Sequence, residues 1–149
     1  MRSRSWPGDQ SAPLVEFAIT FFAVWLIFSG VYAFGYAFYV YNRLETAVAN
    51  AALLGAGYDY DSSNPSTYTT AVRNMALYGD ITAGTTPVVP GLTAANIQVS
   101  VGTDAKSVPR DVQVSISNYQ ISAVFQKFTL VNKPRAVAQF TGRWLCSGC

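Results

Sequence analysis

The sequence contains no histidine, and only 12% of its 149 residues are charged. The lack of histidine removes the commonest general base, the Ser-His and Cys-His nucleophile pairs and most zinc sites. Hydrophobic residues make up 50% of the chain, and the mean hydropathy is +0.21. Together with the low charge, this is too apolar for an ordinary soluble domain and predicts a membrane segment. The length allows one domain at most beside that segment. The net charge is only +2, and without a basic patch interleaved with aromatic residues we expect no nucleic-acid partner.

Acidic residues are few, and only Asp59 and Asp61 lie close together, in "GYDYDSSNPS". Such a pair can be half of a calcium loop, but no downstream glutamate closes it and the spacing fits no EF-hand. We interpret the segment as a solvated loop. We therefore expect no enzyme activity, no cofactor, no metal and no small-molecule substrate.

No charged residue occurs between Glu16 and Arg43. About 25 residues at 1.5 Å rise extend some 37 Å, enough to cross a hydrocarbon core of about 30 Å. We predict a transmembrane helix over residues 12–42, with Pro13 in its first turn, where a missing N–H does no harm. Its second half is rich in tyrosine, as at a membrane interface: Tyr32, Tyr36, Tyr39 and Tyr41.

The flanks of this segment predict its orientation. Arg2, Arg4 and the amino terminus precede it, whereas Arg43 is followed closely by Glu45. The positive-inside rule then keeps residues 1–11 cytoplasmic and places residues 43–149 outside. A cleaved signal peptide is the competing interpretation, but the apolar run is too long, and "AVANA" at 47–51 lies well beyond the membrane edge.

Small residues recur at a spacing of four within the apolar run, at Ser29, Ala33 and Ala37. This spacing lets membrane helices pack closely against another copy or a partner. Alanine and glycine are also common in such helices without any packing role, so both interpretations stay open.

The helical pattern continues past the span in "NRLETAVANAALLGAGYDY", with an apolar stripe that we interpret as a core face. Gly55 and Gly57 are natural C-cap positions for this helix of about 40 residues. A second, shorter helix is predicted over 64–79, with Pro65 near its start and Gly79 as its end. The stretch from Asp80 to Asn96 is predicted to be a loop.

From Ile97 the apolar period changes to two. Three strands are predicted, in "NIQVSVG", "RDVQVSISN" and "RAVAQFTGRW", forming a small antiparallel sheet. The amphipathic end of the long helix is available to cover one face. The predicted fold is therefore α+β, and residues 118–133 stay ambiguous between a core plug and a loop.

The chain ends in "CSGC", with Cys146 and Cys149. Outside the cytoplasm the pair can form a local or intermolecular disulfide, which we favour. A redox centre requires a lowered thiol pKa, typically at a helix N-terminus, and a zinc site requires two further ligands that this chain does not offer.

Three stretches resemble the TadE-like family of pseudopilins, or minor pilins, of the Tad (Flp) pilus, a branch of the type IV pili. They are "LVEFA", "FGYAFYVYNRLETAVANAALLGA" and "VRNMALYGDITAGTTPVVPGLTAANIQVSV". The resemblance implies a prepilin peptidase that cuts on the cytoplasmic side, between Ser11 and Ala12. Glu16 is then the fifth mature residue and Phe17 the sixth, although Ser11 stands where the family usually has glycine.

The resemblance also implies a role for Glu16 in subunit registration. A new amino terminus is positively charged, and a carboxylate one helical turn away or on an adjacent subunit can pair with it at low dielectric. Alternatively, Glu16 suits the positive end of the helix dipole and reaches the headgroups.

We therefore expect a single-pass subunit of the bacterial inner membrane that takes part in Tad pilus assembly, and that can enter the surface pilus. Its expected partners are membrane lipid, other pilins or pseudopilins, Tad assembly proteins and a prepilin peptidase. The alternative is a membrane-anchored extracytoplasmic interaction module that does not enter a filament.

Overall fold

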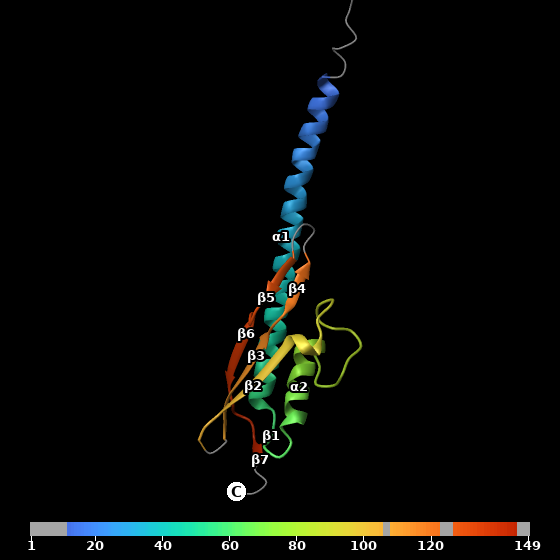
Figure 1. Ribbon diagram of the computed structural model, residues 1–149. Coiled ribbons are helices and arrows are strands. Elements are labelled where there is room, and N and C mark those ends of the chain that lie inside the picture. Colours follow the sequence, from blue (N-terminus) through green and yellow to red (C-terminus); the bar gives the residue numbers. More distant parts are fainter. Residues whose placement is uncertain (1–11, 106–107, 123–126, 146–149) are drawn as a thin grey trace, which may run out of the picture.

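The computed structural model describes residues 12–105, 108–122 and 127–145. One long helix carries a small α+β domain around its C-terminal end (Figure 1). The helices are α1 (Ala12–Gly57), α2 (Pro65–Tyr78) and the short 3₁₀ helix η1 (Ala94–Asn96). The strands are β1 (Tyr60–Asp61), β2 (Ile97–Thr103), β3 (Pro109–Ile116), β4 (Tyr119–Ser122), β5 (Lys127–Leu130), β6 (Arg135–Gln139) and β7 (Trp144–Leu145). The predicted α+β class is confirmed.

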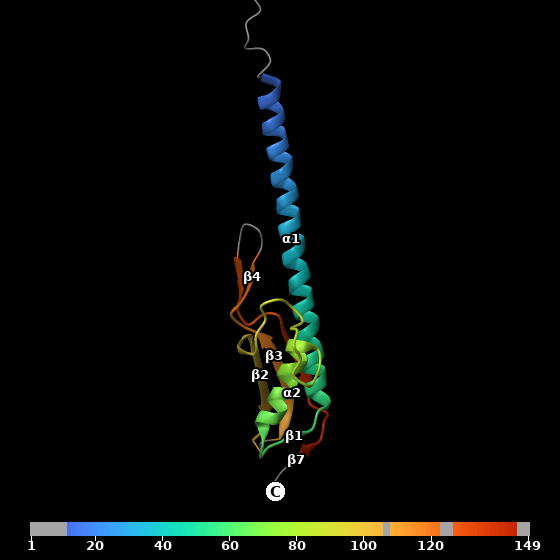
Figure 2. The ribbon, with the colours of Figure 1, turned by 90° about the vertical axis from the view of Figure 1, so that its right-hand side faces the viewer.

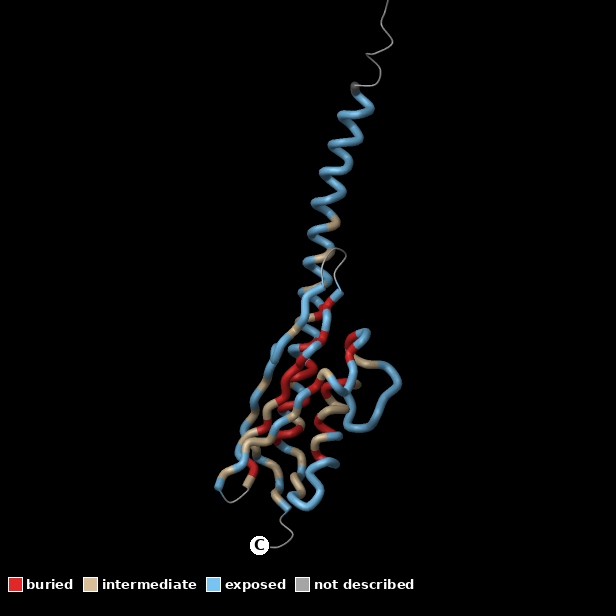
Figure 3. The backbone as a smooth tube through the Cα atoms, in the orientation of Figure 1, coloured by how far each residue is buried: buried red, intermediate tan, exposed pale blue. Residues whose placement is uncertain are grey.

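Helix α1 is continuous over 46 residues, as its unbroken helical pattern predicts. Its N-terminal half projects from the domain and is exposed, whereas its C-terminal half runs through the core (Figure 3). Leu44, Val48 and Ala51 are fully buried. The apolar stripe predicted past the span is therefore a core face.

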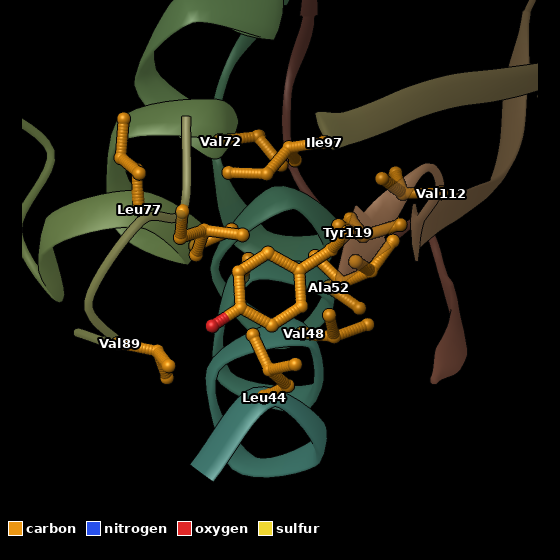
Figure 4. Packing of buried hydrophobic residues seen from close by; sticks show 14 of the residues in the cluster. Leu44, Val48, Ala52, Val72, Leu77, Val89, Ile97, Val112 and Tyr119 are labelled. Carbon is orange, nitrogen blue, oxygen red and sulfur yellow. The ribbon is translucent and has the colours of Figure 1, made fainter. Parts of the chain in front are cut away.

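The three predicted strands form one antiparallel sheet in the order β2-β3-β6. Strand β3 lies in the centre, with Val99 opposite Val114 on one side and Ala136 opposite Val114 on the other. The alternate residues Val112, Val114 and Ile116 are fully buried. Strand β3 packs against α1 and strand β2 against α2. Figure 4 shows Ile97 and Val112 of the sheet in one cluster with Val48 of α1 and Val72 of α2, so the second helix shares with α1 the role of covering the sheet.

Helix α2 begins at Pro65 and ends at Tyr78, as predicted. The Asn64 side chain makes no capping hydrogen bond, so the start depends on the proline. Gly79 follows with a φ of 77°, and its N–H donates to the Met75 carbonyl over 3.0 Å. This left-handed geometry explains why a glycine ends the helix.

The assignment of Gly55 as a C-cap is wrong, because α1 continues to Gly57. A Cβ atom on Gly55 would lie 3.0 Å from the Tyr68 hydroxyl, 3.0 Å from Val112 Cγ1 and 3.1 Å from Val72 Cγ2. Gly55 thus permits the close approach of α1, α2 and β3.

The C-terminal end of α1 is capped by a distant part of the chain. The backbone N–H groups of Thr141 and Gly142 donate to the Ala56 carbonyl over 2.7 and 2.8 Å. The parallel pair β1–β7 lies beside this cap, with Tyr60 opposite Trp144. Such short strands carry no periodic signal, so the sequence pattern did not predict them.

The ambiguous segment 118–133 contributes the paired strands β4 and β5, which we call the β4–β5 ribbon. The core-plug option is confirmed for Tyr119, which is buried, whereas Phe128 stays exposed. The loop option is wrong for these two residues, because both lie in paired strands. The Tyr119 hydroxyl donates to the Pro90 carbonyl over 2.9 Å and ties the ribbon to the preceding loop.

Replacing Tyr68 by phenylalanine is expected to lower the free energy of unfolding by about 1–2 kcal/mol. The buried Tyr68 hydroxyl donates to the Gly55 carbonyl over 2.6 Å, and the variant leaves that carbonyl without this donor. Chemical denaturation of the detergent-solubilised chain measures the loss. Tyr78→Phe, on the same helix, is the control. An equal loss of unfolding free energy in both variants would contradict a stabilising role for the hydrogen bond between Tyr68 and Gly55.

The same side chain makes stability depend on pH. Burial, with a contribution from Tyr60, raises the pKa of Tyr68 well above its usual value of 10.0. As the pH rises, the phenol of Tyr68 therefore loses its proton in the unfolded chain before it does so in the folded chain. Its contribution to the free energy of unfolding is complete below about pH 10 and is lost as the pH rises further. Tyr68→Phe should flatten this alkaline decline.

Candidate functional site

The N-terminal half of α1 presents an unbroken apolar surface. Every large hydrophobic side chain from Leu14 to Tyr39 is exposed. By its length and composition, the helix is long and apolar enough to cross a membrane, and its apolar segment is not buried inside the protein. So large a continuous apolar surface requires lipid or a protein partner.

Aromatic rings form a column on one side of this surface. Phe17 stacks on Phe21 with ring centroids 6.2 Å apart, and Phe21 stacks on Trp25 at 6.4 Å. The spacing of four residues brings these rings onto one face of the helix. Phe17 is therefore part of an exposed aromatic face one residue after Glu16.

Glu16 lies in the second turn of α1 and is exposed. Its backbone carbonyl accepts a hydrogen bond from the Thr20 hydroxyl over 2.9 Å. Within the described residues, Glu16 forms no ion pair. Four residues of helix rise place it about 6 Å along the axis from Ala12, the first residue of α1.

The predicted packing residues Ser29, Ala33 and Ala37 are half-buried and follow one another along α1. Ala37 packs against the domain's own core cluster, so this end of the stripe is already in contact within the chain. Val40 is only 2% exposed. Ala37, Val40 and Tyr41 of the predicted span therefore carry domain contacts, and most of the helix before them projects away from the domain.

The remaining predicted site residues, Ser11, Cys146 and Cys149, lie outside the described residues. The cut between Ser11 and Ala12 and the disulfide stay predictions.

Asp59 and Asp61 have protein partners of their own. Asp59 lies 4.0 Å from the Arg143 guanidinium, and Asp61 accepts a hydrogen bond from the Ser63 backbone N–H over 2.8 Å. They line an open cavity of about 540 Å³ at the end of the domain far from the exposed helix. Across the part of the chain that the structure describes, no group of three or more His, Cys, Asp or Glu side chains is placed to hold a metal ion.

A comparison with protein families matches residues 14–53 to the model described as TadE-like protein. This segment of the chain is TadE-like. No curated protein and no solved structure matches the chain.

The TadE-like segment crosses the junction between the two halves of α1. It contains Glu16, the aromatic column and the small-residue stripe, and it continues through the buried positions Leu44 and Val48. The stretch 72–101, for which we also expected a resemblance, lies outside the matched residues, so its resemblance stays a prediction. The family match thus rests on the helix, and the sheet is known from the structure.

Proposed function

We propose that this protein is a membrane-anchored, pseudopilin-like subunit that takes part in assembling a Tad-type pilus. The observation that carries the proposal is the two-part helix α1. Its exposed apolar half begins beside a single carboxylate, its other half forms the domain core, and the TadE-like match spans both. In this proposal the amino terminus is cytoplasmic, the domain lies outside the inner membrane, and the role is structural rather than catalytic.

The exposed half of α1 would first hold the subunit in the bilayer and then pack among the helices of other subunits. Glu16 would set the register between neighbouring subunits, because it is the only charged side chain between Pro13 and Arg43. A mature chain starting at Ala12 would carry a positive charge about one turn from this carboxylate. In a low-dielectric helix bundle, an unpaired carboxylate is strongly unfavourable, so pairing selects one register.

Processing provides the first test. The protein is produced with and without a prepilin peptidase, and the gel mobility and N-terminal sequence are compared. A mature chain starting at Ala12 supports the proposal. An intact Met1 under both conditions overturns the processed-pilin version and favours an anchored interaction module that never enters a filament.

Replacing Glu16 by glutamine is expected to reduce incorporation into sheared surface pili by about tenfold, because the proposed ion pair in the assembled helix bundle loses one member. Membrane insertion should be unchanged. Incorporation is measured by comparing sheared and cell-bound protein in a strain with the complete Tad system.

Glu45→Gln is the matched control, since Glu45 is an exposed glutamate on the same helix but beside the domain. Equal incorporation of both variants would contradict the proposed role of Glu16 in subunit registration.

A further inference from the structure

The β4–β5 ribbon has one apolar and one polar face. Its antiparallel register places Ile121 opposite Phe128 and Tyr119 opposite Leu130. Because directly opposed residues point to the same side of a ribbon, these four side chains share a face. The alternate positions form the other face and are all polar: Gln120, Ser122, Lys127 and Thr129.

The apolar face is turned toward α1 but closes only in part: Tyr119 and Ile121 on β4 are buried, whereas Phe128 on β5 is exposed. An open groove of about 240 Å³ separates the ribbon from the helix, and its exposed lining is almost entirely apolar. The helix contributes Phe34, Ala37, Phe38 and Tyr41, and the ribbon contributes Ile121, Phe128 and Leu130. Phe128 is 44% exposed and Phe38 is 63% exposed although both line the groove.

The groove lies where α1 would leave a bilayer. Figure 2 shows the ribbon standing beside α1 and extending from the domain toward the exposed half of the helix. The 24 residues from Pro13 to Tyr36 extend about 36 Å, slightly more than a hydrocarbon core of about 30 Å. Phe34 and Phe38 therefore lie at the level of the interface.

The charge of this region suits a lipid surface. Asp111 is the last acidic residue of the chain, whereas Lys127, Lys133 and Arg135 all follow it. These three basic residues are exposed. Val131, 67% exposed, adds to the apolar surface beside them. Basic residues beside exposed apolar side chains are typical of protein segments that lie in the headgroup layer.

We propose that the β4–β5 ribbon is a second membrane contact, with the groove occupied by lipid of the outer leaflet and Lys127 at the phosphate level. The inference depends on the membrane anchoring proposed above. A second protein copy fits less well, because a stable interface takes about 20–30 residues from each partner, whereas seven residues line this groove. This contact would fix the orientation of the domain relative to the membrane before assembly.

The test places one fluorescent label at a time on the full chain in vesicles of phosphatidylethanolamine and phosphatidylglycerol. Both native cysteines are replaced by serine, and a cysteine is introduced as Phe128→Cys, Val24→Cys or Val137→Cys. All three positions are exposed hydrophobic residues. Val24 is central in the apolar segment, and Val137 is on β6, further from the span than the ribbon (Figure 1). Quenchers are carried on lipids, either near the headgroup or deep in the acyl chain.

We expect the label at position 128 to be quenched more strongly by the shallow quencher, the label at 24 more strongly by the deep quencher, and the label at 137 by neither. Quenching at 24 without quenching at 128 overturns the ribbon contact and leaves the anchoring intact. No quenching at 24 overturns the anchoring itself, and the inference with it. Absence of quenching at 128 together with energy transfer between labelled copies identifies a second copy as the occupant of the groove and also overturns the inference.

Discussion

The domain of the Gly55→Val variant is expected to be destabilised by about 3 kcal/mol, because the added side chain overpacks a tight contact. A Cβ atom alone would already meet the Tyr68 hydroxyl and Val112 at 3.0 Å. Valine adds two methyl groups to this space and displaces the hydroxyl that bonds to the Gly55 carbonyl. Denaturant-induced loss of near-ultraviolet circular dichroism, measured on the detergent-solubilised chain, reports this effect on the domain.

Gly57→Val is the matched control. Gly57 lies two residues further along the same helix, is exposed, and would meet nothing within 4 Å of an added Cβ atom. Its variant should unfold within about 0.5 kcal/mol of the parent chain. Equal destabilisation by both valines would show that the contact of α1 with α2 and β3 does not explain the effect.

The double variant Phe22→Arg/Leu26→Arg is expected to lose stable membrane integration. Both side chains are exposed near the middle of the apolar half of α1. An arginine at the centre of a membrane helix is unfavourable by about 3 kcal/mol, so the pair costs about 6 kcal/mol. The measurement is the fraction of protein that stays in the membrane after alkaline extraction.

Asn50→Arg/Leu53→Arg places the same two charges on exposed positions of the same helix, but beside the domain. This control should remain in the membrane like the parent chain, because its arginines stay in water. Equal retention of the two double variants would show that residues 22 and 26 do not lie in hydrocarbon.

Local periodicity was enough to predict the elements with the strongest patterns. The absence of charge between Glu16 and Arg43 predicted the exposed apolar half of α1, and a three- and four-residue stripe predicted its buried half. Pro65 and Gly79 delimited α2 correctly because each acts on its own backbone torsion angles. The alternation of Val112, Val114 and Ile116 predicted the central strand.

Contacts between residues that are far apart in the sequence could not be predicted from local patterns. Gly55 looked like a helix end, but the space around it is set by α2 and β3, whose distance no local pattern encodes. The real end of α1 is capped by Thr141 and Gly142, more than eighty residues away. The β4–β5 ribbon stayed ambiguous because four-residue strands give too short a period to recognise.

The sequence by itself thus determined a long helix with an apolar and an amphipathic half, a lone carboxylate at its start, and an α+β domain with three strands. These features depend on hydrophobicity and torsion preferences that act within one helix or strand. Only the tertiary structure decided the strand order β2-β3-β6, the packing role of Gly55, and the placement of a half-open apolar ribbon beside the apolar half of α1. These depend on side chains that meet only when the whole chain has packed around α1.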